Sequence, residues 1–138
     1  MTAARYAKSY RAMAIATATP GQLILMLFDG ALRSMGIAVN AFNDPNLISR
    51  NETIHNKIIN AQDILRELQT SLDMKAPGDF SPRMYALYDY MIRQLQQANM
   101  KKDPEPIRTV ERLLGTIRDA WAQMLERHSD AAPTFAAA

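Results

Sequence analysis

The sequence of 138 residues contains no cysteine, which excludes a disulfide scaffold, a thiolate metal site and a cysteine nucleophile. Its 5 glycines and 7 prolines are too few for a loop-rich β fold. The longest apolar run is the hexapeptide Leu23–Phe28, far short of the roughly 20 residues that a membrane span needs. The first residues also lack the apolar stretch of a secretory signal. We therefore expect no membrane insertion.

Positive charge is concentrated at the N-terminus. Residues 1–18 carry Arg5, Lys8 and Arg11 and no acidic residue, whereas the rest of the chain has 13 basic and 14 acidic residues. The net charge of +2 therefore reflects a basic arm on a nearly neutral body. Nucleic-acid-binding domains usually carry a basic face. The charge pattern thus disfavours nucleic acid as a partner, and a basic-arm nucleic-acid binder remains the rival interpretation.

A first helix is predicted over residues 20–42. Thr19 and Gln22 form a capping-box pattern, and Pro20 suits the first helical position. The apolar residues then follow a spacing of four and three, typical of one helical stripe. They are Ile24, Phe28, Ala31, Met35, Ala38 and Phe42.

Three further helices follow. The second begins between Pro45 and Asn51, and the third opens at Ser81-Pro82 with two adjacent stripes, the outer one holding Tyr85 and Tyr88. Asp103 caps the fourth. The seam of the second helix comprises Leu47, Ile54, Ile58, Ala61, Leu65, Leu68 and Leu72, and that of the fourth comprises Ile107, Val110, Leu114, Ile117, Trp121 and Met124.

Long helices joined by short turns pack as antiparallel neighbours. We therefore predict an all-α fold, an antiparallel up-down four-helix bundle over residues 19–128. A mobile N-terminal arm with a short helix, residues 1–18, precedes it, and a disordered tail, residues 129–138, follows it.

The predicted bundle has more apolar surface than it needs. Leu23–Phe28 covers the whole circumference of the first helix, and the third helix has two stripes. Either a wide bundle buries this surplus and the arm folds back over it, or a hydrophobic groove receives a partner helix. The arm suits both interpretations, because Tyr6, Tyr10 and Met13 recur at helical spacing.

Catalytic and metal-binding patterns are sparse. Glu52 and His55 form one Glu-x-x-His unit, but di-iron bundles need two units and two further glutamates, and the chain has five glutamates in all. There is no Gly-rich phosphate loop and no triad-like arrangement. We expect no metal, no cofactor and no enzymatic activity. A phosphotransfer or sensor module built on His55 is the alternative function.

Short motifs over residues 8–122 occur in a distinctive order. They are Tyr10 with Ile15–Ala18, Leu23–Ala31, Ala61–Ile64 with Glu67–Leu68 and Ser71–Asp73, Leu87–Met91 with Ala98–Asn99, and Asp119–Trp121. With these motifs in this order, the chain resembles the FliS family, the flagellar export chaperones that bind flagellin. Two features depart from that pattern: Phe28 stands where the family commonly has tyrosine, and residues 43–55 lack the usual acidic stretch.

The resemblance implies a helical bundle in the bacterial cytoplasm whose partner is the C-terminal segment of flagellin, disordered before assembly. It implies that the chaperone prevents premature polymerisation and delivers flagellin to an export-gate component of the flagellar type III secretion apparatus. Tyr10 matches the tyrosine-bearing arm of the family, which by resemblance covers the groove in the free protein. The chain is expected to be a monomer or a homodimer.

A disordered client that folds on binding must bury enough apolar surface to offset its ordering entropy. We expect its anchors to lie on the first and third helices. Gly30 either permits close backbone approach or only tight helix packing, and Asp63 and Asp89 either contact the client or are ordinary solvated positions. The candidate partner-binding residues are Tyr10, Ile15, Leu23, Met26, Leu27, Gly30, Asp63, Tyr85, Tyr88, Asp89 and Ile92.

Overall fold

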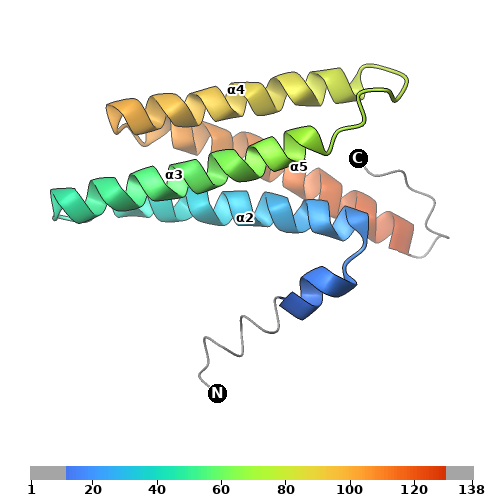
Figure 1. Ribbon diagram of the computed structural model, residues 1–138, viewed down its shortest axis with the longest axis horizontal. Helices are drawn as coiled ribbons and strands as arrows, with labels where there is room; N and C mark the ends of the chain where they lie inside the picture. Colours follow the sequence, from blue (N-terminus) through green and yellow to red (C-terminus); the bar gives the residue numbers. More distant parts are fainter. Residues whose placement is uncertain (1–11, 130–138) are drawn as a thin grey trace.

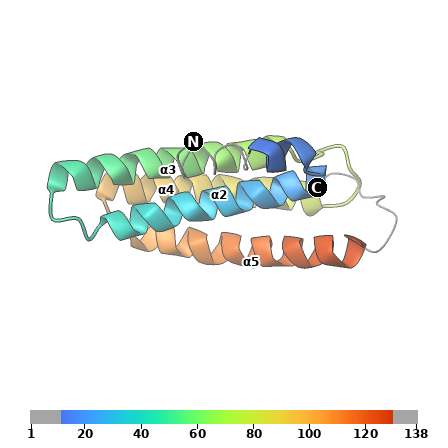
Figure 2. The same cartoon turned by 90° about the horizontal axis from the view of Figure 1, so that it is seen from below.

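The computed structural model describes residues 12–129, which form a short helical segment, residues 12–17, and four long helices. The long helices are α2 (Pro20–Ala41), α3 (Leu47–Thr70), α4 (Phe80–Lys101) and α5 (Glu105–Ser129). They run up and down in sequence order, and α5 returns to pack against α2 (Figures 1 and 2). The predicted all-α antiparallel bundle is confirmed.

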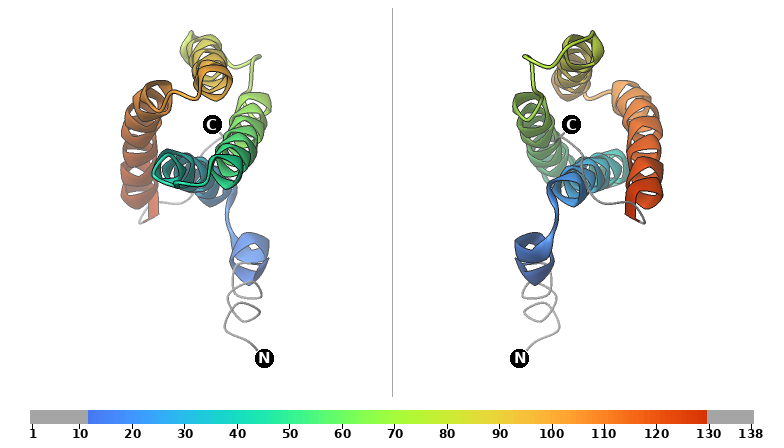
Figure 3. Two further views of the ribbon diagram at one scale, coloured as in Figure 1. Left: turned by 90° about the vertical axis from the view of Figure 1, so that its left-hand side faces the viewer. Right: turned by 90° about the vertical axis from the view of Figure 1, so that its right-hand side faces the viewer.

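The short helical segment, residues 12–17, projects from the bundle (Figure 3). Met13 and Ile15 are exposed there. Residues 1–11 of the predicted arm, including Tyr10, and residues 130–138 of the predicted tail lie outside the described residues.

Local signals in the sequence define most helix ends. At the start of α2 the Thr19 hydroxyl accepts from the Gln22 backbone N–H, and the Gln22 side chain accepts from the Thr19 N–H, completing the predicted capping box. Asn46 caps α3 by accepting from the Ser49 N–H. The Asp103 carboxylate accepts from the Glu105 N–H at the start of α5.

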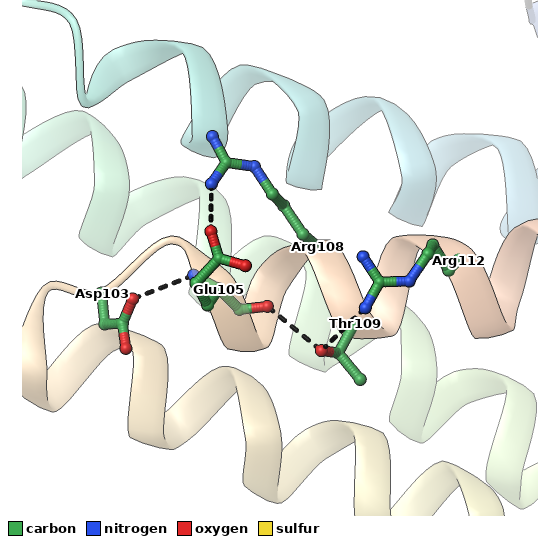
Figure 4. A network of polar contacts seen from close by, with 5 residues as sticks. All are labelled: Asp103, Glu105, Arg108, Thr109 and Arg112. Atoms are coloured by element: carbon green, nitrogen blue, oxygen red, sulfur yellow. Dashed lines mark hydrogen bonds and ion pairs between the residues drawn. The ribbon is translucent and has the colours of Figure 1, made fainter.

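The first turn of α5 continues this polar network (Figure 4). Arg108 pairs with Glu105, and the Thr109 hydroxyl donates to the Glu105 carbonyl. Arg112 in turn donates to the Thr109 hydroxyl. These contacts place a carboxylate and its cations on the solvent side of α5, where the first-turn acid also suits the helix dipole.

The core is the set of apolar stripes turned inward. Ile24, Phe28 and Met35 of α2 meet the α3 seam from Ile54 to Leu68, as the periodicity predicts. The prediction for Leu47 is wrong, because its side chain is 64% exposed. It occupies the first turn of α3, and the α3 contribution to the core begins only at Ile54.

Two predictions for α4 are also wrong. The helix does not open at Ser81; it begins one residue earlier, at Phe80, and Ser81 is buried inside its first turn. Tyr88 is not on an outer surface, since only 3% of it is exposed. Both stripes of α4 reach the interior, because the bundle is wide enough to cover Tyr88, Met91, Ile92 and Leu95 together.

Candidate functional site

An apolar pocket of about 320 Å³ opens where α2 and α4 begin and α3 and α5 end. Figure 1 shows α5 diverging from α4 toward its C-terminal end, so that the last turns of α5 lack a close neighbour on that side. The side chains around the pocket are Ile24, Phe28, Ser71, Leu72, Phe80, Met84, Tyr88, Ile117, Ala120, Trp121 and Met124.

Trp121 holds the α5 wall of the pocket against α2. Its indole Nε1–H donates to the Gly21 carbonyl oxygen over 2.8 Å. Its ring stands edge-on to Phe28, with 6.3 Å between the centroids and 75° between the planes. This T-shaped arrangement is a favoured geometry for aromatic pairs. The hydrogen bond and the ring contact together fix the position of the Trp121 ring in the pocket wall.

One turn away, Arg118 of α5 pairs with Asp29 of α2, with 2.7 Å between Nε and Oδ1. The hydrogen bond that Arg118 donates to Asp29 raises the pKa of Arg118, and Asp119 adds a weaker contact at 3.4 Å. The ion pair is partly exposed and lies beside the pocket. It therefore ties α5 to α2 in addition to the Trp121 bond.

Tyr88 supplies the hydroxyl of the pocket. Burial raises its pKa to about 12, because a desolvated phenolate is unfavourable. The neighbouring polar side chain, Ser71, already donates its hydroxyl hydrogen to the Leu68 carbonyl oxygen. Elsewhere the lining is apolar, and Phe80 at the rim is 56% exposed.

A second apolar surface runs along the outer side of α2 beside α3. Leu23 is 37% exposed, while Met26 and Leu27 are partly buried. Gly30 lies against α3, and a Cβ there would sit 3.4 Å from Ile64 Cδ1. Nearby on α3, Asp63 pairs with Arg66 at 3.4 Å in the solvent. The glycine therefore serves tight helix packing, and this aspartate already has a cationic neighbour.

A third surface lies on the other side of α3, along α4. Tyr85 is 44% exposed, and its backbone carbonyl accepts from Gln69 Nε2 at 3.1 Å. The buried Gln62 makes the equivalent bond to the Ile92 carbonyl, also at 3.1 Å. Asp89 pairs with Arg93 on the solvent side.

Comparison with known proteins decides the family. The family model "Flagellar protein FliS" matches residues 2–128. The chain belongs to the FliS family. The flagellar secretion chaperone FliS of Bacillus subtilis is 37% identical over 118 residues, which is 86% of this chain and 84% of the relative. That of Salmonella typhimurium is 37% identical over 124 residues, 90% of each chain, and that of Escherichia coli is 36% identical over 112 residues.

Within the FliS fold the predicted binding residues do not form one groove. Leu23, Met26 and Leu27 lie on the α2 surface, and Tyr85 lies across α3 on the α4 surface. Tyr88 opens into the end pocket, and Ile92 is buried. None of residues 12–17 lines the pocket, and Ile15 of this segment is exposed.

The sequence does not indicate Phe80 and Ala120 as pocket residues. The α5 periodicity predicts Ile117, Trp121 and Met124 as core, but they line the pocket. Ile117, Trp121 and Met124 continue the three- and four-residue spacing of the buried α5 residues Ile107, Val110 and Leu114. The available signal is indirect. The apolar seam of α5 continues to the level of residues 71–79, which connect α3 to α4 and belong to neither helix. An apolar seam that extends beyond the ends of the neighbouring helices indicates an uncovered surface.

Metal binding, phosphotransfer and membrane insertion each require a particular structural feature. No cluster of three or more metal-ligating side chains occurs among residues 12–129. His55 is exposed, and its Nδ1 lies 2.9 Å from Asn99 Nδ2. In the same described range α2 alone is long and apolar enough to cross a membrane, by length and composition. Seven of its residues are buried in the bundle.

Proposed function

We propose that this chain is a cytoplasmic, non-enzymatic chaperone for flagellin. It binds the disordered C-terminal segment of flagellin, prevents premature polymerisation and hands the client to an export-gate component of the flagellar type III secretion apparatus. Membership of the FliS family supports this role, because its relatives are named flagellar secretion chaperones.

The observation that carries the proposal is the open apolar pocket between α4 and α5, with the exposed side chain of Phe80 at its rim. Contiguous apolar surface of this kind is typical of a protein-binding site. The pocket, the α2 surface and the α4 surface are separated by helices, so a single rigid helix does not reach all three. A disordered client can wrap around the bundle and contact them in turn.

The candidate residues take distinct roles in this arrangement. Leu23, Met26 and Leu27 supply apolar contact on α2, and Tyr85 supplies it on α4. Asp63 and Asp89 lie at the edges of these surfaces, where a client arginine or amide would compete with Arg66 and Arg93. We assign the arm, with Tyr10 and Ile15, to the contact with the export machinery.

Isothermal titration with a peptide of the flagellin C-terminal segment tests the proposal. We expect binding with a Kd of about 10 μM or tighter, which corresponds to roughly −7 kcal/mol. Leu23→Glu should weaken binding at least about tenfold, because it places a charge on the α2 surface. Ile48→Glu is the matched control, since Ile48 is 81% exposed at the opposite end of the bundle. Absence of binding by the unsubstituted chain would refute the proposed function.

Light scattering before and after the titration distinguishes a monomer from a homodimer. Phosphorylation of His55 by a phosphodonor, in a chain that does not bind flagellin, would instead support the phosphotransfer alternative.

A further inference from the structure

The Tyr88 hydroxyl is an uncommitted hydrogen-bond donor inside the apolar pocket. Tyr88 is 97% buried, since 3% of it is exposed, and it lines the pocket. Within residues 12–129 no group forms a hydrogen bond with this hydroxyl. The buried side-chain atom without a partner in that range is Arg50 Nε, not the Tyr88 oxygen. The Tyr88 oxygen therefore keeps some accessible surface, and because Tyr88 lines the pocket we take this surface to face the pocket.

The other polar hydrogens at the pocket are already used. Ser71 donates to the Leu68 carbonyl, and the Trp121 indole donates to the Gly21 carbonyl. An occupant therefore finds apolar walls and one free donor. Small ligand sites generally have this composition, with a few polar groups that fix the orientation of an apolar guest.

A guest that fills the pocket displaces water from the Tyr88 hydroxyl. If the guest offers no acceptor, a buried donor is left unpaired, which costs free energy. If it offers an acceptor, that cost is avoided. The pocket therefore favours apolar guests that carry a hydrogen-bond acceptor next to their apolar group.

We propose that Tyr88 is a specificity-determining residue of the pocket: the pocket takes one large apolar side chain of the client, and the Tyr88 hydroxyl donates a hydrogen bond to an amide carbonyl oxygen beside it. This inference rests on the proposed function and deepens it.

The acceptor restricts the conformation of the client at this point. Inside an α-helix the backbone carbonyls are already bonded, and only the last four are free. The anchoring side chain therefore belongs to the last turn of a client helix or to an extended segment. At the end of the bundle, between α4 and α5, the client backbone is therefore either the end of a helix or extended.

Trp121 provides a direct readout, because it lines the pocket and is the only tryptophan in the chain. A tryptophan-free peptide of the flagellin C-terminal segment should shift its emission on binding. Tyr88→Phe should weaken binding about 3- to 10-fold, since it removes the donor and keeps the ring. Tyr90→Phe is the matched control, because Tyr90 is partly exposed on the same helix and does not line the pocket.

A blocking variant tests occupancy separately. Ala120 is exposed at the pocket, so Ala120→Phe should fill it without disturbing the core and should abolish the emission shift. Ala86→Phe, at an exposed position of α4 away from the pocket, should leave the shift intact. Circular dichroism confirms that each variant is folded.

The outcomes separate the two proposals. If the unsubstituted chain binds and Tyr88→Phe binds equally well, the role of Tyr88 is refuted and the proposed function stands. Unchanged binding by Ala120→Phe would likewise refute occupancy of the pocket. If the unsubstituted chain does not bind the peptide at all, the proposed function itself fails.

Discussion

Trp121 and Gly21 are joined across 100 residues of sequence by an indole N–H bond to a backbone carbonyl, 2.8 Å long. The bond fixes the end of α5 to the first turn of α2 and sets one wall of the apolar pocket. The Asp29–Arg118 ion pair and half-buried side chains such as Ile117 and Met124 also hold α5 at this end. The shape of the candidate site therefore depends on this contact.

Trp121→Phe tests the contact without removing the aromatic ring. The variant loses the hydrogen bond but keeps an edge-on partner for Phe28. We expect the free energy of unfolding to fall by about 0.5–1.5 kcal/mol, the net value of one such bond. Urea denaturation followed by circular dichroism measures it. Trp121→Ala should cost more, because it also removes ring packing, and an equal loss in both variants would show that the ring contributes nothing.

The Asp29–Arg118 ion pair is the second tie between α2 and α5. Asp29→Asn keeps the shape of the side chain and removes its charge, so the melting temperature should fall slightly. The difference from the unsubstituted protein should shrink at about 1 M salt, because screening weakens a partly exposed pair. Asp63→Asn is the control, since its pair with Arg66 lies within one helix and joins no two elements. A loss that does not depend on salt would contradict an electrostatic tie.

Interactions between neighbouring residues made the helices predictable. The Thr19–Gln22 capping box and the Asp103 cap depend on groups two or three positions apart, so the sequence displays them directly. The apolar periodicity also predicts the buried residues correctly where each helix has neighbouring helices along its length. Leu47 shows the limit, because periodicity does not reveal that a first turn extends beyond the core.

The candidate site was less predictable, because it depends on contacts distant in sequence. Two stripes on α4 were visible, but which of them faces inward depends on the width of the whole bundle, and Tyr88 was placed outside. The pocket lies where α5 runs away from α4 at an angle, and Figure 1 shows this divergence of the two helices. No local pattern encodes that angle, which is why Trp121 and Met124 were interpreted as core.

Two glycines give opposite predictions. Gly78, in the α3–α4 connection, has a φ of +92°, a backbone conformation that residues with a Cβ rarely adopt. Gly78→Ala should therefore destabilise the protein by about 1 kcal/mol. Gly115 lies within α5, and apart from its sequence neighbours and the adjacent backbone of the helix, no described atom lies within 4 Å of the position of an added Cβ. Gly115→Ala should stabilise it by about 0.5–1 kcal/mol, since glycine is a poor helix former. Thermal unfolding of both variants checks the signs, and a stabilising Gly78→Ala would contradict the connection described here.

Tyr88 should make the stability of the bundle sensitive to alkaline pH. Burial raises its pKa to about 12 in the folded protein, whereas an unfolded tyrosine ionises near 10. Between these values the unfolded chain has lost a proton that the folded chain retains, so the free energy of unfolding falls as the pH rises. Two units of pKa correspond to roughly 2–3 kcal/mol at most. Comparing Tyr88→Phe with the unsubstituted protein by urea denaturation from pH 9 to 12 isolates this contribution, because the two proteins differ only in the Tyr88 hydroxyl. The variant should show the shallower decline, and ultraviolet titration of the folded protein should show one late-ionising tyrosine that the variant lacks. Identical slopes would contradict a pKa of Tyr88 that burial raises.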